Sequence, residues 1–257
     1  MPPDGETRRL PLYLTPDRPC AYLPGREERV LFVDPHAPMS GPAYESLLAR
    51  GYRRAGRFIS RPACGDCQAC VPVRLAVHHF SPNRSQRRNL VLNQDLRLHD
   101  RPRAFHAEHF ALYAAYLRPR PPDGGMTEQL TPESYRDYLI QPWGGETRLL
   151  EFRLEGRLIA LAVTDRLPQA LSAVYTCFDP AFADRAPGVY AILSQIALAR
   201  LLGLRYLSLG YWLRDCRKMA YKARYRPLQA LIGDEWREFG RGEDIPAQSD
   251  YPQSLLS

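Results

Sequence analysis

The order of apolar runs in the second half of the chain constrains the fold more than any other feature. These runs predict three strands, an amphipathic helix, a strand, a short helix or turn and a last strand, over residues 147–179, 187–204, 206–212, 214–225 and 227–239. Turns are expected at Glu155-Gly156 and around Pro168, between the first three strands. This order predicts an α+β layer, in which a helix crosses between two strands near the middle of a sheet.

The first half predicts a separate α+β region. Residues 1–28 carry many prolines and are expected to be irregular. The predicted strands cover 29–33, 57–62 and 71–80, and the predicted helices cover 42–52, 85–96, 104–117 and 131–140. Ser81 and Pro82 are expected to be the N-cap and the first residue of the helix that runs through 85–96. Residues 119–125 are expected to form a loop. We expect two domains, residues 1–103 with the cysteines and 104–257.

Composition and termini point to a globular protein of the cytoplasm. Hydrophobic residues make up 45% of the 257 residues, and no apolar run reaches the 18 residues of a membrane span. The segment MPPDGETRRLPLY lacks the apolar region of a secretion signal. We therefore expect no membrane partner and reduced thiols.

The positive charge is concentrated in two blocks. Residues 50–90 carry nine arginines against Asp66, and residues 205–226 carry seven basic side chains against Asp215. Such blocks favour binding of a polyanion, and solvated surface arginines are the structural alternative. Three arginines on the helix predicted at 85–96 or just before it suit a phosphate track: Arg84, Arg87 and Arg88.

Only two lysines occur in the chain, and the other 33 basic residues are arginines. Lys218 and Lys222 stand four residues apart, so they share one face if their segment is helical. Both belong to the second basic block.

Three cysteines stand in a C-x2-C-x2-C run at Cys64, Cys67 and Cys70, and Cys20 lies earlier. This spacing lets tight turns aim thiolates at one ion, as in zinc and iron–sulfur sites. Cys20 is the expected fourth ligand. A thiol cluster without metal, or a set of reducible disulfides, is the alternative, and Cys177 and Cys216 are expected to be packing residues.

Four blocks are together similar to the aminoacyl-tRNA–protein transferases, and most closely to their bacterial branch, the aspartate/glutamate leucyltransferases. The blocks are GYRRAGRFISRPACGDCQACVPVRL, FSPNRSQRR, LSAVYTCFDP and LSLGYWLRDCRKMAYKARYRPL. The chain departs from the family at Ala55, where RRSG reads RRAG. It departs again at Leu23, where eukaryotic relatives have a cysteine.

The resemblance implies transfer of leucine from Leu-tRNA to the N-terminal α-amine of proteins that begin with Asp or Glu, which marks them for degradation. It also implies a Gcn5-type N-acetyltransferase-like fold over 104–257, no cofactor required for transfer, and an optional zinc ion or iron–sulfur cluster. Tyr175 and Asp179, at the end of a predicted strand, are the catalytic candidates, with a plain strand end before Pro180 as the alternative. The expected substrate-binding residues are Arg53, Arg54, Arg57, Tyr211, Lys218, Tyr221 and Lys222. Among them, Lys218 and Lys222 are expected to contact tRNA phosphate or the acceptor carboxylate.

Two other functions stay open. An acyl-CoA-dependent N-acetyltransferase would bind pyrophosphate on backbone amides that open the central helix. Here that stretch is Arg185-Ala-Pro-Gly-Val-Tyr190, in which Pro187 removes one amide and Tyr190 is bulky. A non-catalytic, metal-containing RNA-binding module would explain the cysteines and arginines but not the second half.

Overall fold

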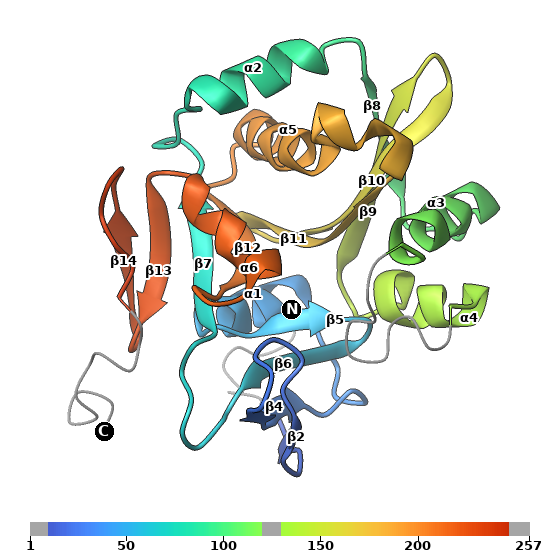
Figure 1. Cartoon of the computed structure of the whole chain (residues 1–257). Coiled ribbons are helices and arrows are strands. Elements are labelled where there is room, and N and C mark those ends of the chain that lie inside the picture. Colours follow the sequence, from blue (N-terminus) through green and yellow to red (C-terminus); the bar gives the residue numbers. More distant parts are fainter. Residues whose placement is uncertain (1–9, 120–129, 247–257) are drawn as a thin grey trace, which may run out of the picture.

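A curved sheet of eight strands dominates the computed structural model, which describes residues 10–119 and 130–246 (Figure 1). The strand order is β14-β13-β7-β12-β11-β10-β9-β8. The strands are β7 Val71–Ala76, β8 Arg97–Pro102, β9 Glu146–Leu154, β10 Arg157–Arg166, β11 Ala170–Phe178, β12 Tyr206–Trp212, β13 Leu228–Ile232 and β14 Glu235–Phe239. Within this sheet, only β11 and β12 run parallel.

The central strand β10 is buried on both faces, because helices cover the sheet from both sides. Leu161 and Val163 pack with α3 (Ala107–Leu117), whereas Ala160 and Ala162 pack with α5 (Pro187–Leu201) on the other face. Successive side chains of a strand point to opposite faces. A strand covered on both faces therefore reads as a nearly continuous apolar run, as β10 does.

The parallel strands β11 and β12 pair over three residues only and then diverge. The pairing joins Ala170–Ser172 to Tyr206–Ser208, and α5 makes the connection between the two strands. Each strand carries a register shift close to this split, β11 against β10 and β12 against β7. Bulges bend strands and interrupt pairing, which accounts for the divergence.

A second sheet, here called the small sheet, lies beside the large one and has the order β1-β4-β6-β5. Its strands are β1 Leu12–Leu14, β4 Val30–Val33, β5 Arg53–Ala55 and β6 Phe58–Pro62. One face packs with α1 (Gly41–Ala49) and Trp143 around Val33, Tyr44 and Ile59. A two-stranded hairpin, β2 Arg18–Pro19 and β3 Glu27–Glu28, precedes β4.

Short helices complete the fold. They are α2 Arg84–Leu92, α4 Pro132–Tyr135, a π-helical turn η1 Arg136–Ile140, the 3-10 turns η2 Pro180–Arg185 and η3 Tyr221–Arg224, and α6 Arg217–Ala220. In Figure 1, α2 lies beyond α5, α3 and α4 lie together, and α6 lies next to β12. The segment from α6 to η3, residues 217–224, contains both lysines and borders the split between β11 and β12.

The α+β class and the main elements of the second half are confirmed. The three strands of 147–179, the crossing helix with Pro187 in its first turn, the strand at 206–212 and the helix that begins after Thr131 are all present. The loop expected at 119–125 lies almost wholly outside the described residues. The division at residue 103 stays a prediction, and both sides of it contribute strands to the eight-stranded sheet.

Several local expectations were wrong. Residues 227–239 form two strands, because Gly233 adopts a positive φ of 61° and turns the chain into a hairpin. Asn83, not Ser81, caps α2, since its side chain accepts from the backbone of Gln86 in a reciprocal capping box. The strand expected at 71–80 ends at Ala76, the irregular region contains β1 to β3, and β8 had not been foreseen.

Candidate active site

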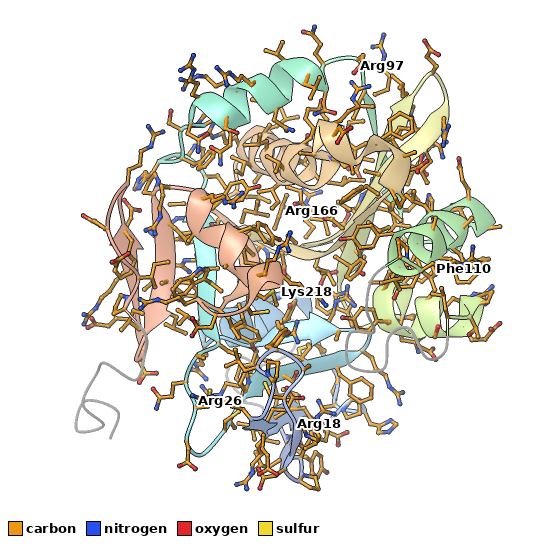
Figure 2. The ribbon with its side chains drawn as sticks, viewed as in Figure 1. Arg18, Arg26, Arg97, Phe110, Arg166 and Lys218 are labelled. Carbon is orange, nitrogen blue, oxygen red and sulfur yellow. The ribbon has the colours of Figure 1, made fainter. Side chains whose placement is uncertain are left out.

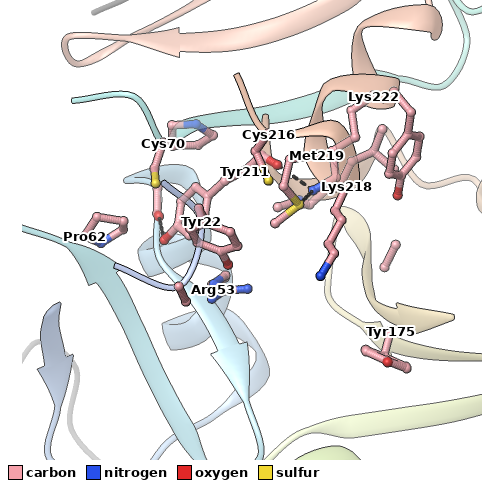
Figure 3. A pocket seen from close by; sticks show the side chains of 18 of the residues that line it. Tyr22, Arg53, Pro62, Cys70, Tyr175, Tyr211, Cys216, Lys218, Met219 and Lys222 are labelled. Carbon is pink, nitrogen blue, oxygen red and sulfur yellow. Dashed lines mark hydrogen bonds between the residues drawn. The ribbon is translucent and has the colours of Figure 1, made fainter. Parts of the chain in front are cut away.

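A cavity of about 2760 Å³ opens where β11 and β12 separate (Figure 3). Its walls come from the two diverging strands, the small sheet, the cysteine-bearing loop before β7 and the segment from α6 to η3. Residues predicted as functional meet here from distant parts of the chain: Cys20, Arg53, Cys64, Cys67, Cys70, Tyr175, Tyr211, Lys218, Tyr221 and Lys222. The cavity joins both basic blocks at the opening of the sheet.

Arg53 stands on the cavity wall between two aromatic rings. Its guanidinium carbon lies 5.8 Å from the ring centre of Tyr22 and 5.1 Å from that of Tyr211. Within the described residues, no carboxylate forms an ion pair with it. The hydroxyl of Tyr211 donates to the carbonyl oxygen of Gly51, so its ring is fixed behind Arg53. A guanidinium stacked on aromatic rings keeps its hydrogen-bonding edge for a carboxylate or phosphate.

Arg54 and Arg57, also predicted to bind substrate, are placed differently. The Arg54 side chain is fully buried and donates to both carboxylate oxygens of Asp165, over 2.6 and 2.8 Å. Thr147 donates to the same carboxylate over 2.7 Å. Arg57 stacks over Phe58 and lines a separate pocket of about 260 Å³. The contacts of Arg54 are those of a structural ion pair.

Lys222 is buried beneath β12, with 6% of its surface exposed. Its ammonium donates to the carbonyl oxygen of Tyr211 and lies 3.2 Å from the sulfur of Met219. Burial lowers its pKa to about 7, and the charge of Arg53 acts in the same direction. Lys222 therefore ties η3 to β12 in the wall of the cavity, with its ammonium already bonded to the backbone.

Lys218 faces the open cavity instead. Its side chain extends into the space between the wall that carries Arg53 and the strand that carries Tyr175 (Figure 3). In the whole-chain view it lies near the middle of the molecule, away from Arg18 and Arg26 on the N-terminal loops (Figure 2). Tyr221 is more than one-third exposed on the same segment and also lines the cavity.

The two catalytic candidates lie in different surroundings. Tyr175 lines the cavity among the rings of Tyr113, Tyr116 and Tyr138, at 5.6 to 6.4 Å, and burial raises its pKa, so the phenol stays protonated. Asp179 accepts from the backbone of Ala181 at the start of η2, and Arg157 donates to it over 2.6 Å. Asp179 is not among the described residues that line the cavity.

The arginines of α2 form an exposed row beside the cavity. Arg84, Arg87 and Arg88 are exposed, whereas Gln86 and Asn89 on the opposite side of the helix are buried. The side-chain amide of Gln86 donates to the backbone oxygen of Arg224 over 3.4 Å, next to Lys222. The row therefore starts at the rim of the cavity.

The four cysteines of the predicted metal site all line this cavity, and all six cysteines of the chain are free thiols. The backbone of Tyr22 donates to the sulfur of Cys20, and burial raises the pKa of Cys70 to about 12, with the neighbouring Cys20 and Cys67 adding to the shift. Sulfur donors of this kind suit zinc or iron–sulfur clusters. However, no group of three or more His, Cys, Asp or Glu in the described ranges is arranged to hold a metal ion. As they are placed, the thiols do not form a ligand sphere.

The start of α5, where an acyl-CoA enzyme would bind pyrophosphate, is already engaged. The guanidinium of Arg185 donates to the backbone oxygen of Leu92 and pairs with Asp95. Asn89 and Asn93 donate to the backbone oxygen of Arg185. Pro187 is the first helical residue and has no backbone N–H, so this turn offers few donors to a pyrophosphate group.

Three contributors escaped the sequence reasoning. Tyr22 supports Arg53, Asp165 neutralises Arg54, and Tyr138 brings a phenol to the cavity from η1. Tyr22 stands two residues after Cys20, which was a usable signal, since the spacing puts it at the same loop. Asp165 lies 111 residues from Arg54, and no local pattern connects the two.

Comparison with known proteins identifies the class of this protein. Residues 18–88 match the family "Arginine-tRNA-protein transferase, N terminus" and residues 108–232 match "Arginine-tRNA-protein transferase, C terminus". The chain belongs to this family of transferase enzymes.

Its curated relatives carry a more specific name, aspartate/glutamate leucyltransferase. The protein from Chromohalobacter salexigens is 46% identical over 239 residues, which cover 91% of this chain and 95% of the relative. The proteins from Chromobacterium violaceum and Nitrosococcus oceani are 43% and 46% identical. These two alignments cover 93% and 87% of this chain, and 98% and 94% of the relatives.

Among solved structures, a C-terminal domain of a putative lysylphosphatidylglycerol synthetase from Agrobacterium fabrum matches with a TM-score of 0.43 and 13% identity. The match covers 56% of this chain and 47% of that chain. No helix in the described parts of the chain is long and apolar enough to cross a membrane.

Proposed function

We propose that this enzyme transfers leucine from Leu-tRNA to the N-terminal α-amine of proteins that begin with Asp or Glu, and so marks them for degradation in the cytoplasm. The cavity carries this proposal, because it brings the two basic blocks to the split between β11 and β12. Near full-length similarity to aspartate/glutamate leucyltransferases supports the choice of leucine and of acidic acceptors.

The reaction needs an amine, an activated carbonyl and a stabilised oxyanion. The neutral α-amine attacks the ester carbonyl carbon, a C–N bond forms, the ester C–O bond breaks, and the terminal ribose hydroxyl leaves with a proton. An α-amino group has a pKa of about 7.7–8.0, so a useful fraction is already neutral at physiological pH, and the proton that its nitrogen loses on attack is the one that the leaving ribose oxygen takes up. The donor ester is already reactive, which leaves the enzyme mainly to position and to stabilise charge.

We place the oxyanion at the open edge of β11. Beyond Ser172 this strand has no pairing with β12, and Ala173 to Thr176 line the cavity. Backbone N–H groups at such an edge can donate to a developing negative charge without reorganisation. Tyr175, kept protonated by burial, is the proposed side-chain donor there. The divergence of β11 and β12, with α5 connecting them, supports a Gcn5-type acyltransferase fold within the α+β class.

Arg53 is the proposed partner of the acceptor's first side chain. Its guanidinium faces the cavity and is fixed by stacking, and a bidentate bond to the Asp or Glu carboxylate would select acidic N-termini. Lys218, a rotatable ammonium that extends into the cavity, suits the terminal phosphates of the tRNA. Arg84, Arg87 and Arg88 extend the positive surface outward along α2 for the rest of the acceptor stem.

The cysteines are proposed to act on structure rather than on chemistry. When bound, a zinc ion or iron–sulfur cluster held by Cys20, Cys64, Cys67 and Cys70 would crosslink two loops of the cavity wall. The thiols do not gather around one point in this structure, so no step of the transfer is assigned to such a group.

A transfer assay tests the proposal. Purified protein is mixed with tRNA that carries radiolabelled leucine or arginine and with peptides that begin with Asp, Glu or Ala. Leucine should appear on the Asp and Glu peptides and not on the Ala peptide. Binding of tRNA without transfer from either donor would sink the proposal, and transfer of arginine alone would replace leucine as the substrate.

A further inference from the structure

The small sheet carries a row of three aromatic rings on the face opposite α1. Tyr13 of β1 pairs with Phe32 of β4, and Phe32 pairs with Ser60 of β6. Phe58 stands two residues from Ser60 and therefore on the same face. The ring centres of Tyr13 and Phe32 are 5.6 Å apart, and those of Phe32 and Phe58 are 6.5 Å apart. These three residues are called the aromatic row.

The aromatic row is open to solvent and continues into the cavity. Tyr13 is 50% exposed and Phe58 is 46% exposed, although the other face of the sheet is buried against α1. Phe32 and Phe58 also line the large cavity, as Arg53 does at the far edge of the sheet. A contiguous run of exposed rings at the mouth of a site is typical of a binding surface.

Arginines without carboxylate partners stand along the row. Arg57, in the turn before β6, stacks on Phe58 at 5.6 Å, and Arg53 pairs with Ser60 and so shares the face of the row. In residues 10–119 and 130–246, neither forms an ion pair, whereas Arg18 and Arg29 of the neighbouring loops pair with Glu28 and Asp17. Rings together with uncompensated positive charge match the chemistry of single-stranded nucleic acid, which has unstacked bases and phosphates.

We propose that the aromatic row binds the single-stranded 3′ end of the charged tRNA, with bases stacked on Tyr13, Phe32 and Phe58 and a phosphate held by Arg57. The inference rests on the proposed function, since that function supplies the tRNA. A single strand of RNA that crosses the row from β1 toward β5 reaches Arg53 and the cavity. Its terminal ester would thus be delivered to the split between β11 and β12. Stacking tolerates any base, so the row does not need to read sequence.

The test compares intact tRNA with the same tRNA lacking its single-stranded 3′ end. Binding to both is measured for the wild-type protein and for Tyr13→Leu and Phe58→Leu, which keep apolar bulk but remove the ring. Leu12→Ala is the matched control, because Leu12 is 47% exposed on the other face of the same strand. Each ring replacement should weaken binding of intact tRNA by roughly 5- to 100-fold. Binding of the truncated tRNA, and all binding by Leu12→Ala, should stay as in the wild type.

Salt dependence separates stacking from charge. Phe58→Leu should shift the plot of log affinity against log salt downward at constant slope, whereas Arg57→Gln should flatten that slope by about one. Thermal melting at the wild-type temperature shows that each variant is folded.

Three results overturn the proposal, the first two in the binding of tRNA. One is wild-type affinity of Phe58→Leu for intact tRNA, and the other is an equal loss for intact and truncated tRNA. Loss of binding to an Asp-starting peptide with unchanged tRNA affinity would also overturn it and would assign the row to the acceptor. Because these are binding measurements, they are independent of the transfer assay. If the wild-type protein transfers no leucine but shows the expected binding pattern, the proposed function is refuted and the binding of tRNA by the aromatic row is not.

Discussion

The burial of Lys222 gives the protein a pH-dependent stability that can be worked out in advance. Burial lowers the pKa of Lys222 to about 7 in the folded protein, and an unfolded lysine has a pKa of about 10.4. Between these values the unfolded chain holds one proton more than the native protein, so the free energy of unfolding rises with pH. Below pH 7 both states are protonated, and the full cost of the buried ammonium is present. The destabilisation is therefore relieved as the pH rises from 7.

The effect of Lys222 on the free energy of unfolding is best measured from pH 7 to about 8.5. Toward the upper end of this range, Cys70 acts in the opposite direction, because burial raises its pKa to about 12, whereas an unfolded thiol, with a pKa of about 8.5, is losing its proton there. At pH 7 half of the native molecules have already lost the Lys222 proton. The contribution of Lys222 to the free energy of unfolding should then increase by about 1.6 kcal/mol across this range.

The variant Lys222→Met removes the titrating group and keeps the length of the side chain. Urea unfolding of both proteins at several pH values should show the variant's relative stability falling by about 1.6 kcal/mol from pH 7 to 8.5. Lys222→Arg keeps its charge throughout and should be less stable than the wild type at every pH. A stability difference between Lys222→Met and wild type that does not change with pH would refute the reasoning.

Four further outcomes follow from the contacts. Gly56→Ala should lose about 3 kcal/mol or more in a denaturant titration, because Gly56 has a φ of 60° and a Cβ there would lie 2.1 Å from the backbone oxygen of Asp137. Asp165→Asn should lose about 3 kcal/mol by the same titration, since it leaves Arg54 buried without its charge partner, while transfer per folded molecule persists. Arg53→Lys should raise KM for an Asp-starting peptide about tenfold in steady-state kinetics, with kcat changed less, because an ammonium cannot form the bidentate pair. Reduced protein treated with a chelator should keep its transfer rate, and a rate that follows metal content in mass spectrometry would contradict the assignment of no step to a metal.

The strands and helix that depend on local periodicity could be predicted from the sequence. β10 was recognisable because burial on both faces leaves an apolar run, and α5 because Pro187 and an apolar helical pattern mark its first turns. β8 was missed because it is an edge strand whose residues, RLHDRP, are mostly exposed and polar. An edge strand with one exposed face gives little hydrophobic signal.

The site could be predicted only as a set of parts. Sequence blocks identified Arg53 and Arg54 together, but in a strand adjacent side chains point to opposite sides, and the Arg54 side chain is buried against Asp165 while that of Arg53 is not. Which of the two is buried depends on Asp165, which lies on a strand of the other sheet. The aromatic row was also invisible, because its three members come from three separate strands and meet only through the register of the small sheet.

The choice of lysine at position 222 follows from the number of partners that the structure offers there. The buried ammonium has one carbonyl oxygen and one sulfur as acceptors, from Tyr211 and Met219. A guanidinium carries five N–H donors and stays charged, so burying it in this place would leave several donors unsatisfied. A lysine can instead give up its proton, and its pKa of about 7 puts that change at physiological pH. In a chain that uses arginine for almost every positive charge, this position suits lysine because the side chain is buried, and Arg53 remains the charge that we propose meets the substrate.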